Sequence, residues 1–299
     1  MAIIEEGQEK KSPPILAGWI NGFIGVLIFS GSLPATKLAI AGFNPLFLTF
    51  CRASIAGAIA VLLVTGLREK VPHRTHLGSL LIVALGVVIG FPLLTAMALK
   101  STSASHSIVF LGLLPLMTAI FGVLRAGERP QASFWLFSLL GSGLVVGYAL
   151  LQGASLLMSG DLLMLSAIIV CGLGYAEGAK LSRILGGWQV ICWSLIIALP
   201  CMLFATYATL PQHFAAITTT SWLALGYVSL FSMLIGFIFW YNGLAIGGIT
   251  AIGQLQLLQP FIALALSALL LHEKITFTML LVSVGVILCV IGAKKFAKR

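Results

Sequence analysis

Apolar residues run along the chain in ten long stretches that short polar connectors separate. A helix needs about 20 consecutive apolar residues to cross the hydrocarbon core of a bilayer. The stretches that meet this length are residues 15–40, 45–66, 75–98, 103–125, 132–151, 160–182, 187–209, 221–245, 249–271 and 276–293. The pattern therefore predicts an all-α integral membrane protein of ten transmembrane helices, with short tails at residues 1–14 and 294–299.

The composition agrees with this interpretation. Hydrophobic residues make up 60% of the 299 positions and charged residues 8%, whereas soluble domains carry roughly 25% charged residues. The five cysteines lie inside apolar stretches without metal-ligand or redox spacing, so we expect no metal or cofactor. The chain also lacks a phosphate-binding P-loop motif and an intramembrane pair of aspartates, so we expect no enzymatic activity.

Basic residues give the chain a net charge of +9. They lie in short connectors and tails rather than in one water-facing patch, so nucleic acid is not an expected partner. With both tails in the cytoplasm, most of the 17 Lys and Arg residues fall on the cytoplasmic side, as membrane topology requires. The sequence thus predicts a multi-pass protein of the cell inner membrane with both termini cytoplasmic.

The two halves of the chain, residues 15–151 and 152–293, share a pattern of proline and charge. Pro115 and Pro260 are 145 residues apart, and each is followed by a glutamate and then a basic residue. Because each half holds five spans, an odd number, the second copy must enter the membrane from the opposite side. The pattern predicts two inverted five-helix repeats around a central cavity, a plan that recurs in secondary transporters.

The motifs resemble those of the drug/metabolite transporter superfamily, specifically its ten-helix EamA-type exporters. The residues that carry the likeness are Phe50-x-Arg52, Pro115-x12-Glu128-Arg129 and Pro260-x12-Glu273-Lys274. Within the superfamily, the chain is most similar to the branch that exports aromatic and other amino acids. The resemblance implies that spans 1, 3, 4, 6, 8 and 9 surround the cavity. The chain departs from symmetry at Arg52, which has no basic counterpart in the second half.

Polar side chains within apolar spans are costly, so they are expected to face a cavity or each other. The residues predicted to bind substrate are Gln254, Gln256, Gln259, His106, Ser107, Tyr175, Asn242 and Trp240. Gln256 and Gln259 share a helix face and Gln254 does not, so we expect either that pair or Gln254 alone at the site. Amide side chains can bind both the carboxylate and the ammonium of an amino acid. The alternative is that they only join helices.

A second group of residues is predicted to be structural or to control access: Pro115, Pro260, Arg52, Glu177 and Lys180. Glu177 and Lys180 are one helical turn apart, which predicts an ion pair between them. Arg52 is expected to bond to carbonyl groups of other spans rather than to substrate. Glu128 and Glu273 are expected at the starts of spans 5 and 10, where a helix N-terminus favours negative charge.

These features predict a secondary transporter that exports amino acids by alternating access, with a preference for aromatic or apolar side chains. The alternative within this fold is an exporter of cationic drugs or of another small metabolite. A membrane scaffold or receptor without transport activity is the alternative from a different class. His106 is a candidate for proton coupling, or else for a hydrogen bond to a neighbouring serine. We expect a monomer or a weak dimer.

Overall fold

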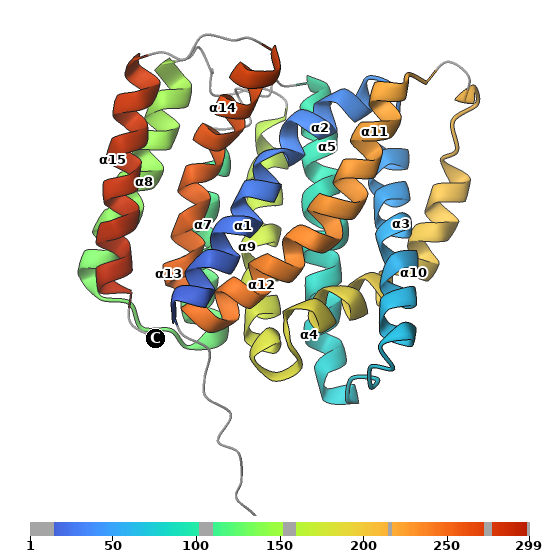
Figure 1. Ribbon diagram of the computed structural model, residues 1–299, viewed down its shortest axis with the longest axis horizontal. Helices are drawn as coiled ribbons and strands as arrows, with labels where there is room; N and C mark the ends of the chain where they lie inside the picture. Colours follow the sequence, from blue (N-terminus) through green and yellow to red (C-terminus); the bar gives the residue numbers. More distant parts are fainter. Residues whose placement is uncertain (1–14, 102–109, 152–159, 215–216, 272–276, 298–299) are drawn as a thin grey trace, which may run out of the picture.

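The computed structural model describes residues 15–101, 110–151, 160–214, 217–271 and 277–297, and these are all helical or in connections between helices (Figure 1). The predicted span 103–125 is described from residue 110, so His106 and Ser107 lie outside the described residues. Glu273 and Lys274 lie outside them as well.

The first half of the chain folds into helices that match its predicted spans. They are α1 (Ile15–Ser30), α2 (Ser32–Ile40), α3 (Pro45–Gly66), η1 (Arg74–His76), α4 (Leu77–Val83), the π-helical η2 (Ala84–Gly90), α5 (Phe91–Ser101), α7 (Leu114–Ala126) and α8 (Ala132–Leu151). Local sequence sets several boundaries. The Asn44 side chain accepts a hydrogen bond from Leu46 N at 3.0 Å ahead of Pro45, and Gly127 ends α7 with a φ of 69°.

The second half follows the same order. Its elements are α9 (Asp161–Leu185), α10 (Gly187–Ala208), α11 (Thr219–Tyr227), the π-helical η4 (Val228–Ile235), α12 (Gly236–Gly247), α13 (Ile249–Gly253), the 3₁₀-helical η5 (Gln254–Leu258), α14 (Gln259–Leu271) and α15 (Phe277–Phe296). Gly186 and Gly248, with φ of 102° and 96°, separate consecutive helices.

Within the described ranges, six helical segments are long and apolar enough to cross a membrane. They are Ile15–Ile40, Pro45–Gly66, Arg74–Lys100, Asp161–Leu185, Gly187–Ala208 and Thr219–Gly247. Shorter apolar helices cover Leu114–Ala126, Ala132–Tyr148 and Ile249–Ala263. Large apolar side chains such as Leu62, Phe204 and Leu223 are exposed on the outside of the bundle, as lipid-facing residues are.

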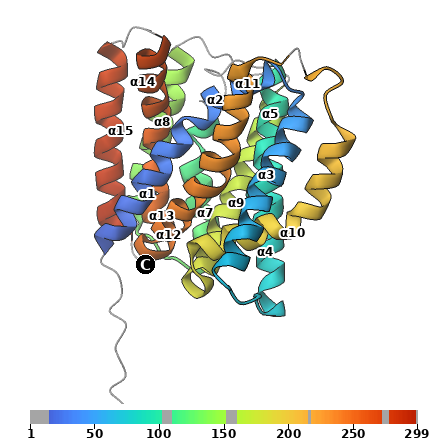
Figure 2. The same cartoon turned by 45° about the vertical axis from the view of Figure 1, so that its right-hand side comes forward.

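Helices of the two halves pair with one another across the bundle. Helix α8 lies beside α15 at one edge, and α3 packs on α10 at the other (Figures 1 and 2). Between these edges α1 crosses α12, with Gly18 against Gly247 and Gly22 against Gly243. A Cβ atom on Gly18 would lie 2.6 Å from Gly247 N, so these two backbones touch without intervening side chains.

The described ends of the chain lie at the same end of the bundle, the lower end in Figure 1. There the Lys294 ammonium lies 4.4 Å from the centre of the Trp19 ring, which joins the last helix to the first. The Gln131 N–H donates to Phe296 O at 3.1 Å, which places the connector between α7 and α8 at that end too.

Departures from regular α-helix occur at matching places in the two halves. The π-helical segments begin at Ala84 and Val228, 144 residues apart. Each is followed by a helix, and the N–H that closes the π segment donates five residues back, from Phe91 to Gly86 O and from Gly236 to Phe231 O. Single π-helical turns inside helices are frequent at functional sites.

Candidate functional site

A cavity of about 50 Å³ lies inside the bundle. Its wall is largely apolar, formed by Phe29, Leu33, Val87, Phe91, Pro92, Leu111, Leu114, Tyr175 and Phe237. Its polar groups come from Ser32, Thr36, Arg52, Thr95, Ser232 and Gln259. Binding cavities for small molecules also combine an apolar wall with a few converging polar groups, but they typically measure about 300–1,000 Å³, so this cavity would have to widen to admit more than a few water molecules.

The elements around the cavity come from both halves of the chain. They are α1, α2, η2, α5, α7, α9, η4, α12 and α14, together with α3 and the residues just before α7. These elements lie in the six spans that the family resemblance implied, with Arg52 of α3 added. Several are interrupted at this depth, by Gly31 between α1 and α2 and by the π segments. Irregular backbone at membrane depth is tolerated where it lines a cavity.

Arg52 is the charged residue among those lining the cavity, and its side chain is only 7% exposed. Its Nη2 donates to Ser232 Oγ at 3.1 Å, and Ser32 Oγ donates to the same oxygen at 2.8 Å. The Arg52 Nε is buried without a hydrogen-bond partner in the described part of the chain. The sequence predicted bonds from Arg52 to backbone carbonyls. The structure instead gives it a serine hydroxyl of the second half.

The three predicted glutamines are placed differently. Gln259 lines the cavity, and its Nε2 donates to Phe29 O at 3.3 Å. Gln254 and Gln256 are buried one turn earlier, in η5, and are not among the residues lining the cavity. The amide nitrogen and oxygen of both lack hydrogen-bond partners among the described residues.

Aromatic rings form one side of the cavity. The ring of Phe237 lies 5.1 Å from Phe29 and 5.9 Å from Tyr175, between ring centres. Trp240 is fully buried behind them, with its ring centre 5.4 Å from that of Tyr175. Asn242 lies elsewhere, because its Oδ1 accepts a hydrogen bond from Gly187 N at the start of α10, at 3.1 Å.

The two prolines of the repeat occupy equivalent positions. Pro115 is the second residue of α7, and Pro260 is the second residue of α14. A proline at the beginning of a helix costs no intrahelical hydrogen bond, since the first N–H groups have no partner within the helix. The preceding residues, Leu114 and Gln259, both line the cavity. The prolines therefore mark where new helices start at the cavity wall.

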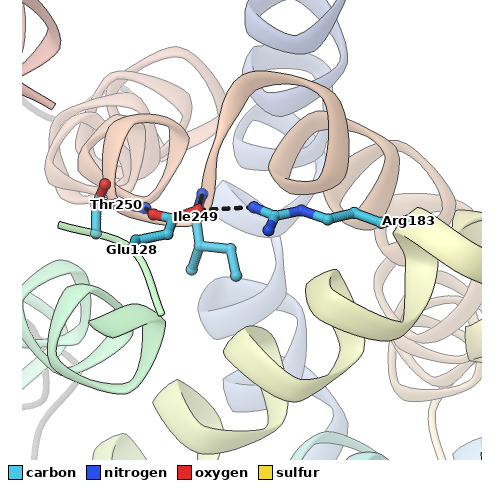
Figure 3. A network of polar contacts seen from close by, with 4 residues as sticks. All are labelled: Glu128, Arg183, Ile249 and Thr250. Carbon is cyan, nitrogen blue, oxygen red and sulfur yellow. Dashed lines mark hydrogen bonds and ion pairs between the residues drawn. The ribbon is translucent and has the colours of Figure 1, made fainter. Parts of the chain in front are cut away.

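A second polar cluster, formed by Glu128, Arg183, Ile249 and Thr250, joins the two halves (Figure 3). The Glu128 carboxylate is 3% exposed and accepts hydrogen bonds from Ile249 N at 2.8 Å and Thr250 N at 2.7 Å. Arg183 Nη2 donates to it at 2.7 Å. The sequence predicted that Glu128 would lie at the N-terminus of span 5 and interact with it. Glu128 does precede α8, but its carboxylate binds the N-terminus of α13 in the other half. This contact could not be predicted from the sequence, because Glu128 is far along the chain from Ile249 and Thr250.

Glu177 is paired with a different residue from the one its spacing predicted. Its carboxylate, on a side chain 1% exposed, accepts from Arg125 Nε at 2.7 Å and from Ser79 Oγ at 2.6 Å. Lys180 is exposed on the same helix and is not its partner. The prediction of a pair between Glu177 and Lys180 is wrong, because Glu177 faces the bundle interior whereas Lys180 faces outward.

Sequence reasoning missed the small polar residues of the cavity, Ser32, Thr36, Thr95 and Ser232. Single hydroxyl residues are common in apolar helices and bond to their own backbone.

A bundle of apolar helices that are interrupted around an internal cavity with a few converging polar groups is typical of a membrane transport protein. The model of the EamA-like transporter family matches residues 16–150 and again residues 158–293, so this chain belongs to that family. The resemblance to EamA-type proteins inferred from the motifs is thereby confirmed. Because one model matches each half, the two halves also resemble one another.

Two individual proteins extend the comparison. The chain is 60% identical over 281 residues to a protein named "Uncharacterized transporter YdeK" from Bacillus subtilis (strain 168), covering 94% of this chain and 98% of that protein. A solved structure described as "Crystal structure of protein" has a TM-score of 0.77 at 17% identity, covering 92% of this chain and 97% of that one. The latter likeness concerns the fold alone.

Proposed function

We propose that this protein is a secondary transporter that exports amino acids by alternating access, with the cavity beside Arg52 and Gln259 as its substrate site. The observation that carries the proposal is a buried cavity in which polar groups of both halves meet beside aromatic rings. The polar groups suit the charged backbone of an amino acid, and the rings suit an aromatic or apolar side chain.

The proposal includes ten membrane-spanning helices in two inverted repeats. Helix α1 starts at the end of the bundle where Trp19 meets Lys294, whereas α9 finishes there, where Arg183 meets Glu128. The opposite directions of these corresponding helices support inversion. The repeated family match and the paired π segments support the repeat itself.

The proposed orientation places that end of the bundle in the cytoplasm of a cell whose inner membrane the protein crosses. Arg125, Arg183 and Lys294 all lie towards it, through their contacts with Glu177, Glu128 and Trp19. An excess of basic residues on one side supports a cytoplasmic assignment.

Among the predicted site residues, Gln259 and Tyr175 are proposed to contact substrate directly, because both line the cavity. Trp240 supports the aromatic wall from behind. Gln254 and Gln256 are proposed to gain partners, either substrate or polar groups of neighbouring helices, when the cavity opens. Their unsatisfied amides would be costly in a single rigid state. His106 and Ser107 remain proposed site residues outside the described ranges.

An exporter of cationic drugs fits the cavity less well. A cation requires a carboxylate or a comparable acceptor, and the described residues lining the cavity include no acid. The buried carboxylates Glu128 and Glu177 are each paired with an arginine away from it. An amino acid, or another small metabolite with a negatively charged group, suits the site better.

Flux into liposomes tests the proposal. Purified protein should move labelled threonine, methionine or phenylalanine, measured with and without an imposed proton gradient to reveal coupling. Protein-free liposomes provide the background. A panel in which no amino acid moves would contradict the amino-acid assignment, and a scaffold or receptor would behave in this way.

A further inference from the structure

We infer that Arg52 is the anchor for the carboxylate of the substrate, and that the site recognises amphipathic monocarboxylates whether or not they carry an ammonium group. The inference rests on the proposed transport function and names the class of ligand. Its basis is the uncompensated charge of one side chain at the cavity wall.

Arginine side chains stay protonated in proteins, so Arg52 carries a positive charge at the cavity wall. Its side chain is 7% exposed, and no ion pair joins it to an acid in the described part of the chain. A buried charge without a counter-charge is strongly unfavourable in lipid surroundings, and residues of this kind mark substrate and ion pathways. By contrast, the buried Glu128 and Glu177 are each satisfied by an arginine. Arg52 has no acidic partner of this kind among the described residues.

The donors around the cavity match an anion. Arg52 Nε has no acceptor among the described residues, and the same is true of the Thr95 hydroxyl, which lines the same cavity. Ser232 Oγ accepts hydrogen bonds from both Arg52 and Ser32, which leaves its own proton free to donate. A carboxylate accepts from several donors at once and is well suited to a guanidinium edge.

The rest of the wall sets the shape of the ligand. Phe29, Tyr175 and Phe237 give the cavity an aromatic side that would hold an apolar tail. No acid lines the described wall to bind an ammonium, and the Gln259 amide already donates to Phe29 O. The one positive charge of the site, on Arg52, therefore complements a ligand with one negative charge. The ligand can carry an α-ammonium but does not need one.

Competition on the wild-type protein tests this directly. Four compounds share a phenyl group and differ in charge: phenylalanine, 3-phenylpropionate without the ammonium, 2-phenylethylamine without the carboxylate, and phenylalanine methyl ester. We expect phenylalanine and 3-phenylpropionate to raise the melting temperature of the purified protein and to compete for flux in liposomes, and the two cationic compounds to do neither. Equal effects of 2-phenylethylamine would overturn the inference.

The variants Arg52→Gln and Arg52→Lys test the residue. In Arg52→Gln the ligand carboxylate loses its charged partner, so the concentration of 3-phenylpropionate needed for half-maximal competition should rise at least about tenfold. Arg52→Lys, which keeps the charge, should recover part of this loss. The matched control is Arg74→Gln, which removes an exposed arginine in η1. Should Arg52→Gln fail to fold, Ser232→Ala, which removes a neutral donor, is expected to weaken the carboxylate effect in the same direction.

The outcomes separate the two claims. Stabilisation by carboxylates without any flux would contradict the transport proposal and leave the anchor standing. Amino-acid flux that is unchanged in folded Arg52→Gln would contradict the anchor and leave transport standing. If neither carboxylates nor amines stabilise the wild-type protein, the anchor is wrong.

Discussion

Among the residues that the structure describes, three charged side chains are buried: Arg52, Glu128 and Glu177. Glu128 and Glu177 each have an arginine and further donors, so their burial is compensated. Arg52 has a serine hydroxyl and an unused Nε. A buried charge whose partners are all within the protein holds the fold together, whereas a buried charge without a counter-charge is available to bind a ligand.

Gln259 is the predicted glutamine that reaches the cavity, and its equivalent in the first half is Leu114. We expect Gln259→Leu, a change of similar size, to remove the hydrogen bond to Phe29 O and reduce amino-acid flux several-fold, since one hydrogen bond contributes about 1 kcal/mol. Initial rates over a range of concentrations in liposomes measure this. Thermal unfolding serves as the folding control. Unchanged flux would make Gln259 a packing residue.

The partner of Glu177 can be tested by stability. Arg125→Gln should lower the melting temperature because it leaves a buried carboxylate with only Ser79. The arginine is 41% exposed, so solvent screening keeps the loss moderate. Lys180→Gln is the matched control and should lower the melting temperature less, because Lys180 is exposed and forms no salt bridge with Glu177. Equal destabilisation by both changes would restore the pair that helical spacing predicted.

Elements could be predicted well where length and hydrophobicity define them. The stretches 45–66, 132–151 and 249–271 match described helices or helix series at both ends. The interruptions could not be predicted, because a π segment such as η2 depends on the packing around it. The partner of Glu128 was equally hidden, since Ile249 and Thr250 are distant in sequence. Of the residues that line the cavity, Gln259, Tyr175 and Arg52 were singled out from the sequence, whereas the hydroxyl residues were not.

The crossing of α1 and α12 depends on glycine. We expect Gly18→Ala to destabilise the protein by about 1–3 kcal/mol through overpacking, because its Cβ would lie 2.6 Å from Gly247 N. Gly143→Ala is the matched control, as nothing lies within 4 Å of a Cβ there. Chemical or thermal unfolding in detergent compares the two. Similar stability of both variants would show that the helices separate readily.

In the whole molecule, contacts between the two halves occur both at one end of the bundle and in its interior. The α1–α12 crossing, the link between Arg52 and Ser232 and the binding of Glu128 to α13 all connect first half to second. A fold shared at 17% identity with a TM-score of 0.77 is consistent with an architecture held by patterns of small, apolar and interrupted positions rather than by particular residues.

The first and last described residues lie at the same end of the bundle, which leads to a topological prediction. Tags placed after residue 299 or before residue 1 should be reached by protease or antibody only from the cytoplasmic side, because Lys294 contacts Trp19 and basic residues gather at that end. Right-side-out and inverted membrane vesicles distinguish the compartments. Tags on opposite sides would require an odd number of spans.

The contacts of Glu128 also constrain how α13 can separate from the first half of the chain. Its carboxylate accepts from two backbone N–H groups of α13 and from the Arg183 guanidinium of α9, so separating α13 from the first half must release both N–H groups, and moving α9 away with it must release the guanidinium as well. Partial withdrawal would strand a charge and dipoles in an apolar setting. We therefore expect spectroscopic distances between α13 and the first half to fall into two discrete populations, and a continuous spread of distances would refute a latch of this kind.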